Sequence, residues 1–288
     1  MHGLISDIRS NRAVCSVQLD SLMGAAAAVQ LDESSRAFYR DALSRLEREG
    51  VKYLVGGAYA FARYTGIERH TKDFDIFIRR EDFACAAETL EKAGYETELT
   101  FSHWLGKAFH GDDFVDLIFS AGNGVATVDD LWFEHAVPAQ VIDMDVQLIP
   151  PEEMIWSKGL IMERERFDGA DVAHVIHSAG KELDWRRLID RYDRYWRVLY
   201  AHCILFGFIY PSKRSNVPEW LMHEFADRLS KEKTDAAEKI CYGTIISRQQ
   251  YLKDIEEWGY KDARLQRGTM SRDEIAHWTA GIAQDGAK

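Results

Sequence analysis

Two aspartates one residue apart, Asp73 and Asp75, are the first residues in this sequence whose spacing could support chemistry. They lie in the run Asp73-Phe74-Asp75-Ile76, where charged and apolar side chains alternate as in a strand. Side chains two apart share one face of a strand, so the carboxylates project together while Phe74 and Ile76 face a core. Adjacent like charges repel unless a cation lies between them, solvent screens them or one takes a proton. Because Mg²⁺ prefers carboxylate oxygens, we expect a metal site here.

A third carboxylate and a glycine pair complete this candidate site. Asp116 stands inside the apolar run 114–119, where an acid needs a partner. Gly56-Gly57 falls between a predicted strand and a predicted helix. Without Cβ atoms the backbone can approach a ligand closely, and the N–H groups that open a helix attract phosphate, so we expect a triphosphate there. A surface turn beside a solvated acidic strand would explain either signal alone.

The elements that must position these residues alternate between helix and strand before residue 150. The patterns predict helices over 34–49, 58–64 and 81–93, and strands over 51–55, 73–78, 107–110, 114–119, 139–142 and 146–149. The turn of a hairpin is expected at Gly111-Asp112-Asp113. The fold class is therefore α/β (α+β), with a mixed sheet.

Proline marks the division of the chain. All five prolines lie at or after position 138, and the pair Pro150-Pro151 is the clearest break. We expect the sheet domain over residues 1–150, with an N-terminal helix, and an all-helical domain over residues 151–288 that ends in a weakly patterned C-terminal extension. The chain has 288 residues, 46% of them hydrophobic, which is sufficient for two domains with a sizeable core.

The order of these signals resembles the nucleotidyltransferases of the DNA polymerase β-like superfamily. Their pattern is a helix-opening Gly-Gly or Gly-Ser, a D-x-D strand and a third acid on a neighbouring strand. The sequence is most similar to the minimal bacterial branch with the abortive-infection and toxin-type enzymes, where R-x-T-x-D-x-D follows the Gly-Gly helix. Arg69, Thr71, Asp73 and Asp75 match that motif residue for residue. The resemblance covers about half of the chain, from Lys52 to Leu188.

The resemblance implies that Asp73, Asp75 and Asp116 are catalytic and hold the metal, two Mg²⁺ ions with Mn²⁺ as the alternative. Asp116 would also help to deprotonate the attacking hydroxyl. The implied nucleotide-binding residues are Gly56, Gly57, Arg69, Thr71, Lys158 and Asp171.

Lys158 and Asp171 come from the second half of the chain. Lys158 falls on the expected buried stripe of the helix after Pro151, where similar enzymes place a lysine that contacts phosphate. A lysine whose stem alone is buried is the alternative. Asp171 ends the segment 166–171, which resembles an acid-rich motif of these enzymes, although Phe167 stands where a lysine is often found.

The implied reaction is Mg²⁺-dependent transfer of a nucleoside monophosphate from ATP or another NTP to a hydroxyl acceptor, with release of pyrophosphate. The acceptor could be a tRNA end, a protein side chain or a small molecule such as an aminoglycoside-like antibiotic. A non-catalytic nucleotide-binding or regulatory protein that retains the fold is one alternative. A metal-dependent phosphohydrolase that uses the region of His174 is another, although we expect His174 and His177 to be ordinary helix residues.

Charge and composition limit the partners. The 36 lysines and arginines against 47 aspartates and glutamates give a net charge of −11, opposite to that of proteins that wrap around duplex nucleic acid. The candidates for a local RNA contact are Arg187, Arg191 and Arg194. Ion pairs within the same helix, Asp190 with Arg194 and Asp193 with Arg197, are the alternative role for this charged surface.

No apolar run is long enough to span a membrane, and the four scattered cysteines lack metal-ligand spacing, so we expect a reduced, cytoplasmic protein.

Overall fold

The computed structural model describes residues 32–69, 71, 73–233 and 238–281. Seven strands in this part of the chain form one sheet in the order β3-β4-β5-β2-β1-β7-β6. They are β1 (Leu54–Val55), β2 (Asp73–Phe77), β3 (Glu96–Phe101), β4 (Leu105–His110), β5 (Asp113–Ile118), β6 (Val137–Val141) and β7 (Met144–Leu148). β2 runs parallel to β5 and antiparallel to β1, which in turn runs parallel to β7. The predicted α/β class with a mixed sheet is confirmed.

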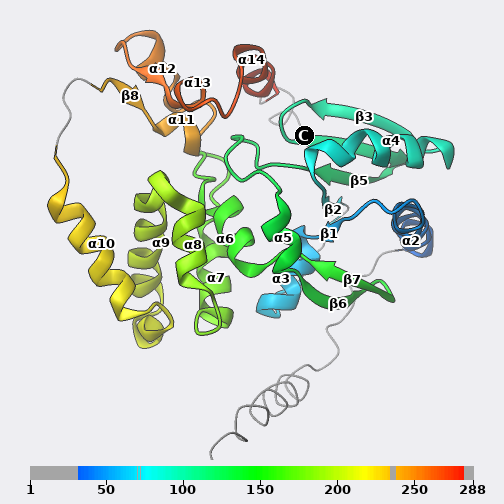
Figure 1. Cartoon of the computed structure of the whole chain (residues 1–288), viewed down its shortest axis with the longest axis horizontal. Helices are drawn as coiled ribbons and strands as arrows, with labels where there is room; N and C mark the ends of the chain where they lie inside the picture. Colours follow the sequence, from blue (N-terminus) through cyan, green and yellow to red (C-terminus); the bar gives the residue numbers. More distant parts are fainter. Residues whose placement is uncertain (1–31, 70, 72, 234–237, 282–288) are drawn as a thin grey trace, which may run out of the picture.

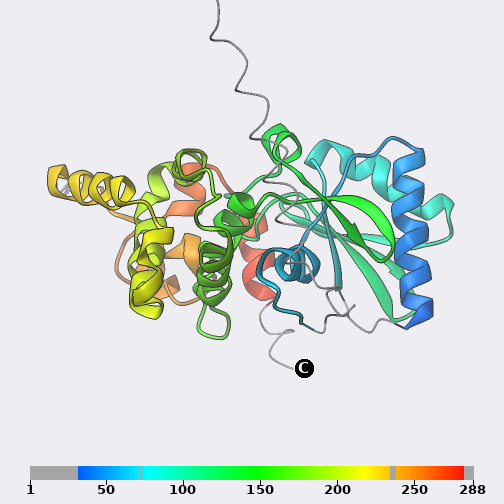
Figure 2. The same cartoon turned by 90° about the horizontal axis from the view of Figure 1, so that it is seen from below.

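Helices in the first half hold the strands in place. Helix α2 (Glu33–Arg48) begins at Asp32, whose carboxylate accepts a hydrogen bond from the backbone N–H of Ser35 at 2.8 Å. The helix packs beside α4 (Phe83–Lys92), as Figure 2 shows from below. Helix α3 (Gly57–Thr65) follows β1 directly and contacts β2. Because α3 begins at Gly57 and packs against β2, the glycine pair lies beside the strand that carries Asp73 and Asp75.

A group of helices follows Pro150 (Figure 1). They are α6 (Pro151–Gly159), α7 (Gly169–Ala179), α8 (Trp185–Tyr192), α9 (Trp196–Ile209) and α10 (Glu219–Lys231). The helix α3 contacts α7, and the hydrophobic core runs without a break from the sheet into this group. The division into domains at residue 150 stays a prediction. Among the described helices, none is both long and apolar enough to cross a membrane.

The end of the chain turns back to the sheet, and here one expectation is wrong. The second half is not all-helical, because β8 (Ile240–Cys241) pairs in parallel with β9 (Lys261–Asp262). The expected weakly patterned extension contains α11 (Gly243–Ile246), α12 (Leu252–Glu256), α13 (Ala263–Arg267) and α14 (Arg272–Ala280). Figure 1 shows α14 beside β3, and the two are in contact. Most of these elements have two to five residues, too few for a periodic pattern.

Smaller differences concern the first half. Strand β3 was not expected, because it lies at the edge of the sheet and its exposed and partly buried residues do not alternate regularly. The predicted strand 51–55 is shorter and pairs only at Leu54 and Val55. The predicted helix 81–93 opens as a 3₁₀ turn over Arg80–Asp82.

Candidate active site

The three predicted carboxylates lie on two neighbouring strands. Asp75 of β2 and Asp116 of β5 are direct partners in the parallel register. Phe74 and Ile76 are fully buried, whereas Asp73 is exposed and Asp75 is half-buried. The alternation in the sequence therefore places the two β2 carboxylates on the face opposite the core residues.

Nearby cations neutralise the negative charge of these carboxylates only in part. Burial, followed by the charges of Asp116 and Asp73, raises the pKa of Asp75 to about 7. Burial also raises the pKa of Asp116, although the Nζ of Lys107 lies 2.6 Å from its carboxylate. Lys107, on β4, was not singled out from the sequence. Its ammonium group also lies 3.9 Å from the centre of the Phe114 ring.

Gly57 makes room for one of these carboxylates. Its φ of +53° lies in the left-handed region, and a Cβ atom built on it would lie 1.7 Å from the Oδ2 of Asp75. The backbone N–H of Gly56 donates to the carbonyl of Asp75 at 3.0 Å. The glycine pair and the D-x-D strand are therefore packed directly against each other.

Lys158, Asp171 and Arg69 form one ion cluster beside this strand. The Nζ of Lys158 lies 2.8 Å from Asp171 and 3.2 Å from Asp168. Arg69 donates two hydrogen bonds to Asp171, one of them at 3.0 Å. Burial alone would raise the pKa of Asp171, but the bonds from Arg69 and the charge of Lys158 hold that pKa below its usual range. Asp171 therefore orients two cations and is itself fully occupied by them.

Thr71 lies next to the carboxylates in sequence, and within the described part of the chain its side chain bonds to the backbone of Asp73 alone. Its Oγ1 accepts from the N–H of Asp73 at 3.1 Å and donates to the carbonyl of the same residue at 3.2 Å. This local loop fixes where β2 begins.

A cavity of about 500 Å³ is lined by some of these residues. It lies between the sheet, helix α6 and the returning C-terminal segment, and its charged lining residues near the strands are Asp75, Asp116, Lys107, Lys158 and Arg166. Gly57 also lines it, whereas Asp73, Arg69, Thr71 and Asp171 do not. Arg166 is held on Asp168 by hydrogen bonds of 2.9 and 3.0 Å.

The carboxylate oxygens of this site suit a hard divalent ion, but they do not form a complete set of metal ligands. Asp75 and Asp116 offer carboxylate oxygens on one face, and their raised pKa values show that added positive charge would be favourable. Among the described residues, however, no three His, Cys, Asp or Glu side chains are gathered closely enough to form a metal site. Part of the negative charge of Asp116 is already neutralised by its ion pair with Lys107.

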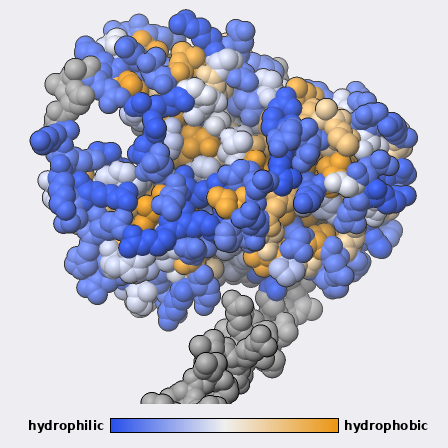
Figure 3. Space-filling view, in the orientation of Figure 1, coloured by the Kyte–Doolittle hydropathy of each residue, from blue (hydrophilic) through white to orange (hydrophobic). Residues whose placement is uncertain are grey.

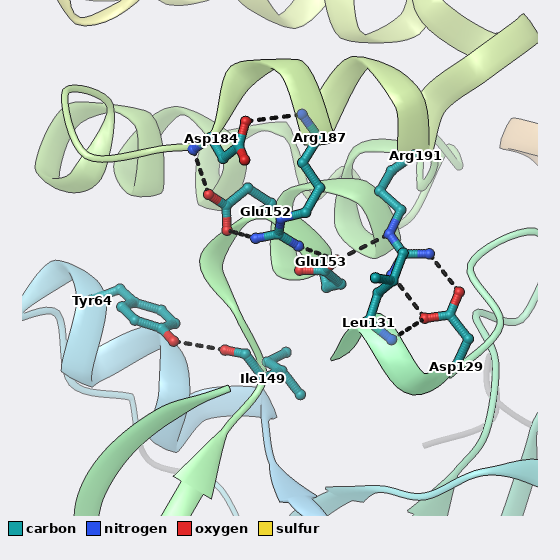
Figure 4. Close-up of polar contacts among 9 residues, drawn as sticks. All are labelled: Tyr64, Asp129, Leu131, Ile149, Glu152, Glu153, Asp184, Arg187 and Arg191. Carbon is teal, nitrogen blue, oxygen red and sulfur yellow. Dashed lines mark hydrogen bonds and ion pairs between the residues drawn. The ribbon is translucent and has the colours of Figure 1, made fainter. Parts of the chain in front are cut away.

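The arginines proposed as an RNA contact lie elsewhere, and for two of them the expectation is wrong. Figure 4 shows Arg187 and Arg191 pointing into the protein toward Glu152, Glu153 and Asp129. The Arg191 guanidinium lies 2.6 Å from Asp129 and 3.0 Å from Glu153, and its side chain is 9% exposed. Both arginines therefore tie α8 to the start of α6 and cannot face a nucleic acid.

The expected pairs within the helix are also replaced by others. Arg194 contacts Asp193, its neighbour in sequence, at 3.6 Å. Arg197 pairs with Glu232, directly after the last residue of α10. His174 packs edge-on to Phe61 with ring centres 6.3 Å apart, and His177 packs on Tyr210. Neither histidine lines the cavity of the carboxylates.

Comparison with solved structures returned antibiotic-modifying and related enzymes at low similarity. A lincosamide antibiotic adenylyltransferase, LnuA, solved with lincomycin bound, is 18% identical over 50% of this chain and 96% of its own, with a TM-score of 0.36. ANT(2'')-Ia, solved with adenylyl-2''-tobramycin, is 18% identical over 68% of this chain and 99% of its own, with a TM-score of 0.34. An antigenic nucleotidyltransferase-like protein from Paracoccidioides brasiliensis is 15% identical over 50% and 76% of the two chains, with a TM-score of 0.34. These scores are too low to bear on substrate.

Comparison with curated proteins found no match. The model of a family described as uncharacterised nucleotidyltransferases matches residues 11–205. This range includes the glycine pair, the three carboxylates, Lys158 and Asp171, and it exceeds half of the chain. The nucleotidyltransferase resemblance of the sequence is thereby confirmed, and this chain belongs to that family of nucleotidyltransferases.

Proposed function

We propose that this nucleotidyltransferase moves a nucleoside monophosphate from a magnesium-bound NTP to a hydroxyl group, in the cavity between the sheet and α6. The observation that carries the proposal is the pairing of Asp75 with Asp116 in register, directly beside the Cβ-free position at Gly57. Carboxylates, a glycine turn at a helix start and cavity-lining cations are the groups needed to seat a metal-bound triphosphate.

Asp75 and Asp116 would hold the ion, Mg²⁺ or Mn²⁺, and Asp73, at the exposed start of β2, would have to move toward them to become a third ligand. When bound, it would supply positive charge that acidifies the acceptor hydroxyl and neutralises the departing pyrophosphate. Positive charge beside these carboxylates would be favourable, because burial and the charges of Asp116 and Asp73 raise the pKa of Asp75 to about 7. Asp116 would have to exchange part of its contact with Lys107 for the ion.

Two cations from the helical half would meet the phosphates. Lys158 and Arg166 line the same cavity as Gly57, and each is held in place by Asp168. Arg69 acts one step further away, because it orients Asp171, which in turn contacts Lys158. Thr71 acts similarly on the backbone of Asp73.

The reaction then balances as an in-line substitution at the α-phosphorus. The acceptor oxygen forms a bond to this phosphorus while the bond to the bridging oxygen of the β-phosphate breaks, and pyrophosphate leaves. The proton of the acceptor passes to the carboxylate of Asp116, whose pKa burial has raised. A tRNA end, a protein side chain and a small molecule all provide such a hydroxyl. A cytoplasmic location stays a prediction.

The test incubates the purified chain with α-labelled ATP, GTP, CTP or UTP, Mg²⁺ and separate pools of cellular RNA, protein and small molecules. We expect label in one pool, lost by at least 100-fold in Asp75→Asn and Asp116→Asn. Asp112→Asn is the matched control, since Asp112 is an exposed carboxylate on the same hairpin as Asp116. Binding of Mg·NTP without transfer to any pool would favour the non-catalytic alternative. Loss of activity in His174→Ala with Asp75→Asn active would favour the phosphohydrolase.

A further inference from the structure

The last forty residues of the described chain are bound to the sheet by specific contacts. We call residues 240–281 the return segment; it lies outside the range 11–205 that the family model matches. The side-chain amide of Asn123 donates to the carbonyl of Ile245 at 2.9 Å, and the N–H of Met162 donates to that of Ile246 at 2.9 Å. The start of the return segment is therefore fixed between the two halves of the protein.

The other end of the return segment is anchored to the β3–β4 hairpin. Ser102 donates to Glu274 at 3.0 Å, and the rings of His103 and Trp278 lie edge to face with centres 5.9 Å apart. A Cβ atom on Gly122 would lie 2.9 Å from the Trp278 ring, so the loop after β5 and the return segment are in close contact there. Figure 2 shows α14 between the helical half and the sheet.

Between these anchors the return segment forms one wall of the cavity that holds the carboxylates. The return segment, the β3–β4 hairpin that it contacts and the end of β5 line this part of the cavity with mainly apolar and aromatic side chains: Phe101, Trp104, Ile118, Ile245, Ile246 and Trp278. Two polar atoms in this region, the Nε1 of Trp104 and the Oγ1 of Thr100, are buried without a hydrogen-bond partner among the described residues. A buried polar atom without a partner costs free energy, so this part of the fold is not optimised for stability alone.

This wall lies on the acceptor side of the carboxylates. In the sheet order, β4 and β3 lie beyond β5 and Asp116, whereas β1 and Gly57 lie on the opposite side of Asp75. If the triphosphate is at Gly57 and Asp116 takes the proton, the attacking hydroxyl must come from the side of β4 and β3. This step rests on the proposed function.

The charges of the cavity restrict what can enter. Its lining contains four cations, Lys107, Lys158, Arg166 and Arg248, and three carboxylates, Asp75, Asp116 and Glu163. Asp116 is already paired with Lys107, and Glu163 with Arg248 at 2.9 Å. No carboxylate is left for a polycationic acceptor except Asp75, which the metal requires.

We infer that the return segment and the β3–β4 hairpin form the acceptor subsite, and that it takes a small, neutral or anionic hydroxyl compound with a planar apolar body. The aromatic wall would hold the planar body by stacking and apolar contact. The same wall disfavours aminoglycoside-like polycations.

Ligand-observed NMR on the full chain tests this subsite without requiring turnover. The probes are 2-naphthol and 4-hydroxybenzoate on one side and tobramycin on the other, each with and without Mg²⁺ and α,β-methylene-ATP. We expect the two aromatic probes to bind more tightly than tobramycin. Trp278→Ala should weaken them at least 10-fold and leave the affinity for the nucleotide analogue within twofold. Trp258→Ala is the matched control, because Trp258 is an exposed tryptophan of the return segment that does not line the cavity.

Further variants keep the test decisive if Trp278→Ala does not fold. Trp278→Phe should retain probe binding within about threefold, and Ile246→Ala should weaken it while thermal stability is maintained. Tighter binding of tobramycin than of 2-naphthol would overturn the proposal. So would a loss in Trp278→Ala of nucleotide affinity instead of probe affinity, because the wall would then hold the base. Failure of the nucleotide analogue to bind the unmodified chain would count against the proposed function, while probe binding without nucleotide still measures the subsite.

Discussion

At the scale of single residues, Asp75 has opposite effects on activity and stability. Its pKa is raised to about 7 in the folded protein from 3.8, so the folded state holds this proton more tightly than the unfolded chain. The resulting stabilisation is complete below about pH 4 and is lost as the pH rises through 7. In metal-free protein, Asp75→Asn should therefore increase the free energy of unfolding by about 2 kcal/mol at pH 8 and change it little at pH 4.

Urea denaturation in EDTA at the two pH values measures this difference. Asp112→Asn should leave the unfolding free energy unchanged at both. A less stable Asp75→Asn protein at pH 8 would show that the carboxylate is already compensated in the folded state.

Alanine substitutions at Gly57 and Gly50 distinguish the effect of backbone strain from the effect of a contact in the candidate active site. Both have positive φ, +53° and +74°, but a Cβ atom would strike Asp75 at Gly57 and meets nothing within 4 Å at Gly50. Gly50→Ala should cost about 1 kcal/mol in stability and retain full transfer activity. Gly57→Ala should displace the Asp75 carboxylate and reduce transfer by about 100-fold or more. Equal activities of the two variants in the labelled-NTP assay would contradict this role of Gly57.

The sequence predicted the carboxylates but not Lys107, and the reason is register. Alternation along one strand is enough to put Asp73 and Asp75 on the same face. The partner of Asp116 depends on the turn between β4 and β5, which was expected to have three residues and has two, since His110 pairs with Asp113. A shift of one residue reverses which side chains meet across a hairpin, so the pair Lys107–Asp116 could not be found.

At the scale of elements, the arginines of α8 tie this helix to the start of α6, and Arg191 also contacts Asp129 of the first half. Arg187 contacts both Glu152 and Glu153 at the start of α6, and its side chain is 12% exposed. Arg187→Ala would leave two buried carboxylates without that cation, so we expect a loss of about 3 kcal/mol in the free energy of unfolding. Arg194→Ala, a half-exposed arginine of the next turn, should change it by less than about 0.5 kcal/mol. Chemical denaturation of both variants measures the contrast, and similar small losses would mean that the buried pairs are replaceable.

Helical periodicity explains why this role was missed. The spacing of Arg187 and Arg191 correctly places them on one face of a helix, but it does not say which element that face contacts. The long helices with a clear cap, such as α2, were predicted within about two residues, a usual margin for helix ends. The return segment was not, because its short elements are stabilised by contacts with the sheet and with the loop after α6 and have little local pattern.

At the scale of the whole molecule, the surface offers fewer cations than the composition suggests. The net charge is −11, and three of the arginines that contribute to it, Arg187, Arg191 and Arg264, are buried in pairs with acids. On the face in Figure 3, hydrophilic side chains predominate and hydrophobic ones occur in small groups. The protein therefore has few cations available to replace the counterions of a nucleic acid.

This balance predicts weak binding to duplex DNA. Each phosphate contact requires an accessible Lys or Arg and makes the affinity fall with salt, so a protein with few of them should bind weakly and with a shallow salt dependence. Fluorescence anisotropy with a labelled 30-base-pair duplex between 50 and 200 mM NaCl should show no saturation below about 10 µM protein. A labelled tRNA run in parallel tests whether a local contact exists although Arg187 and Arg191 are buried. Sub-micromolar duplex binding that decays steeply with salt would mean that the accessible cations form a continuous basic surface, contrary to the charge distribution found here.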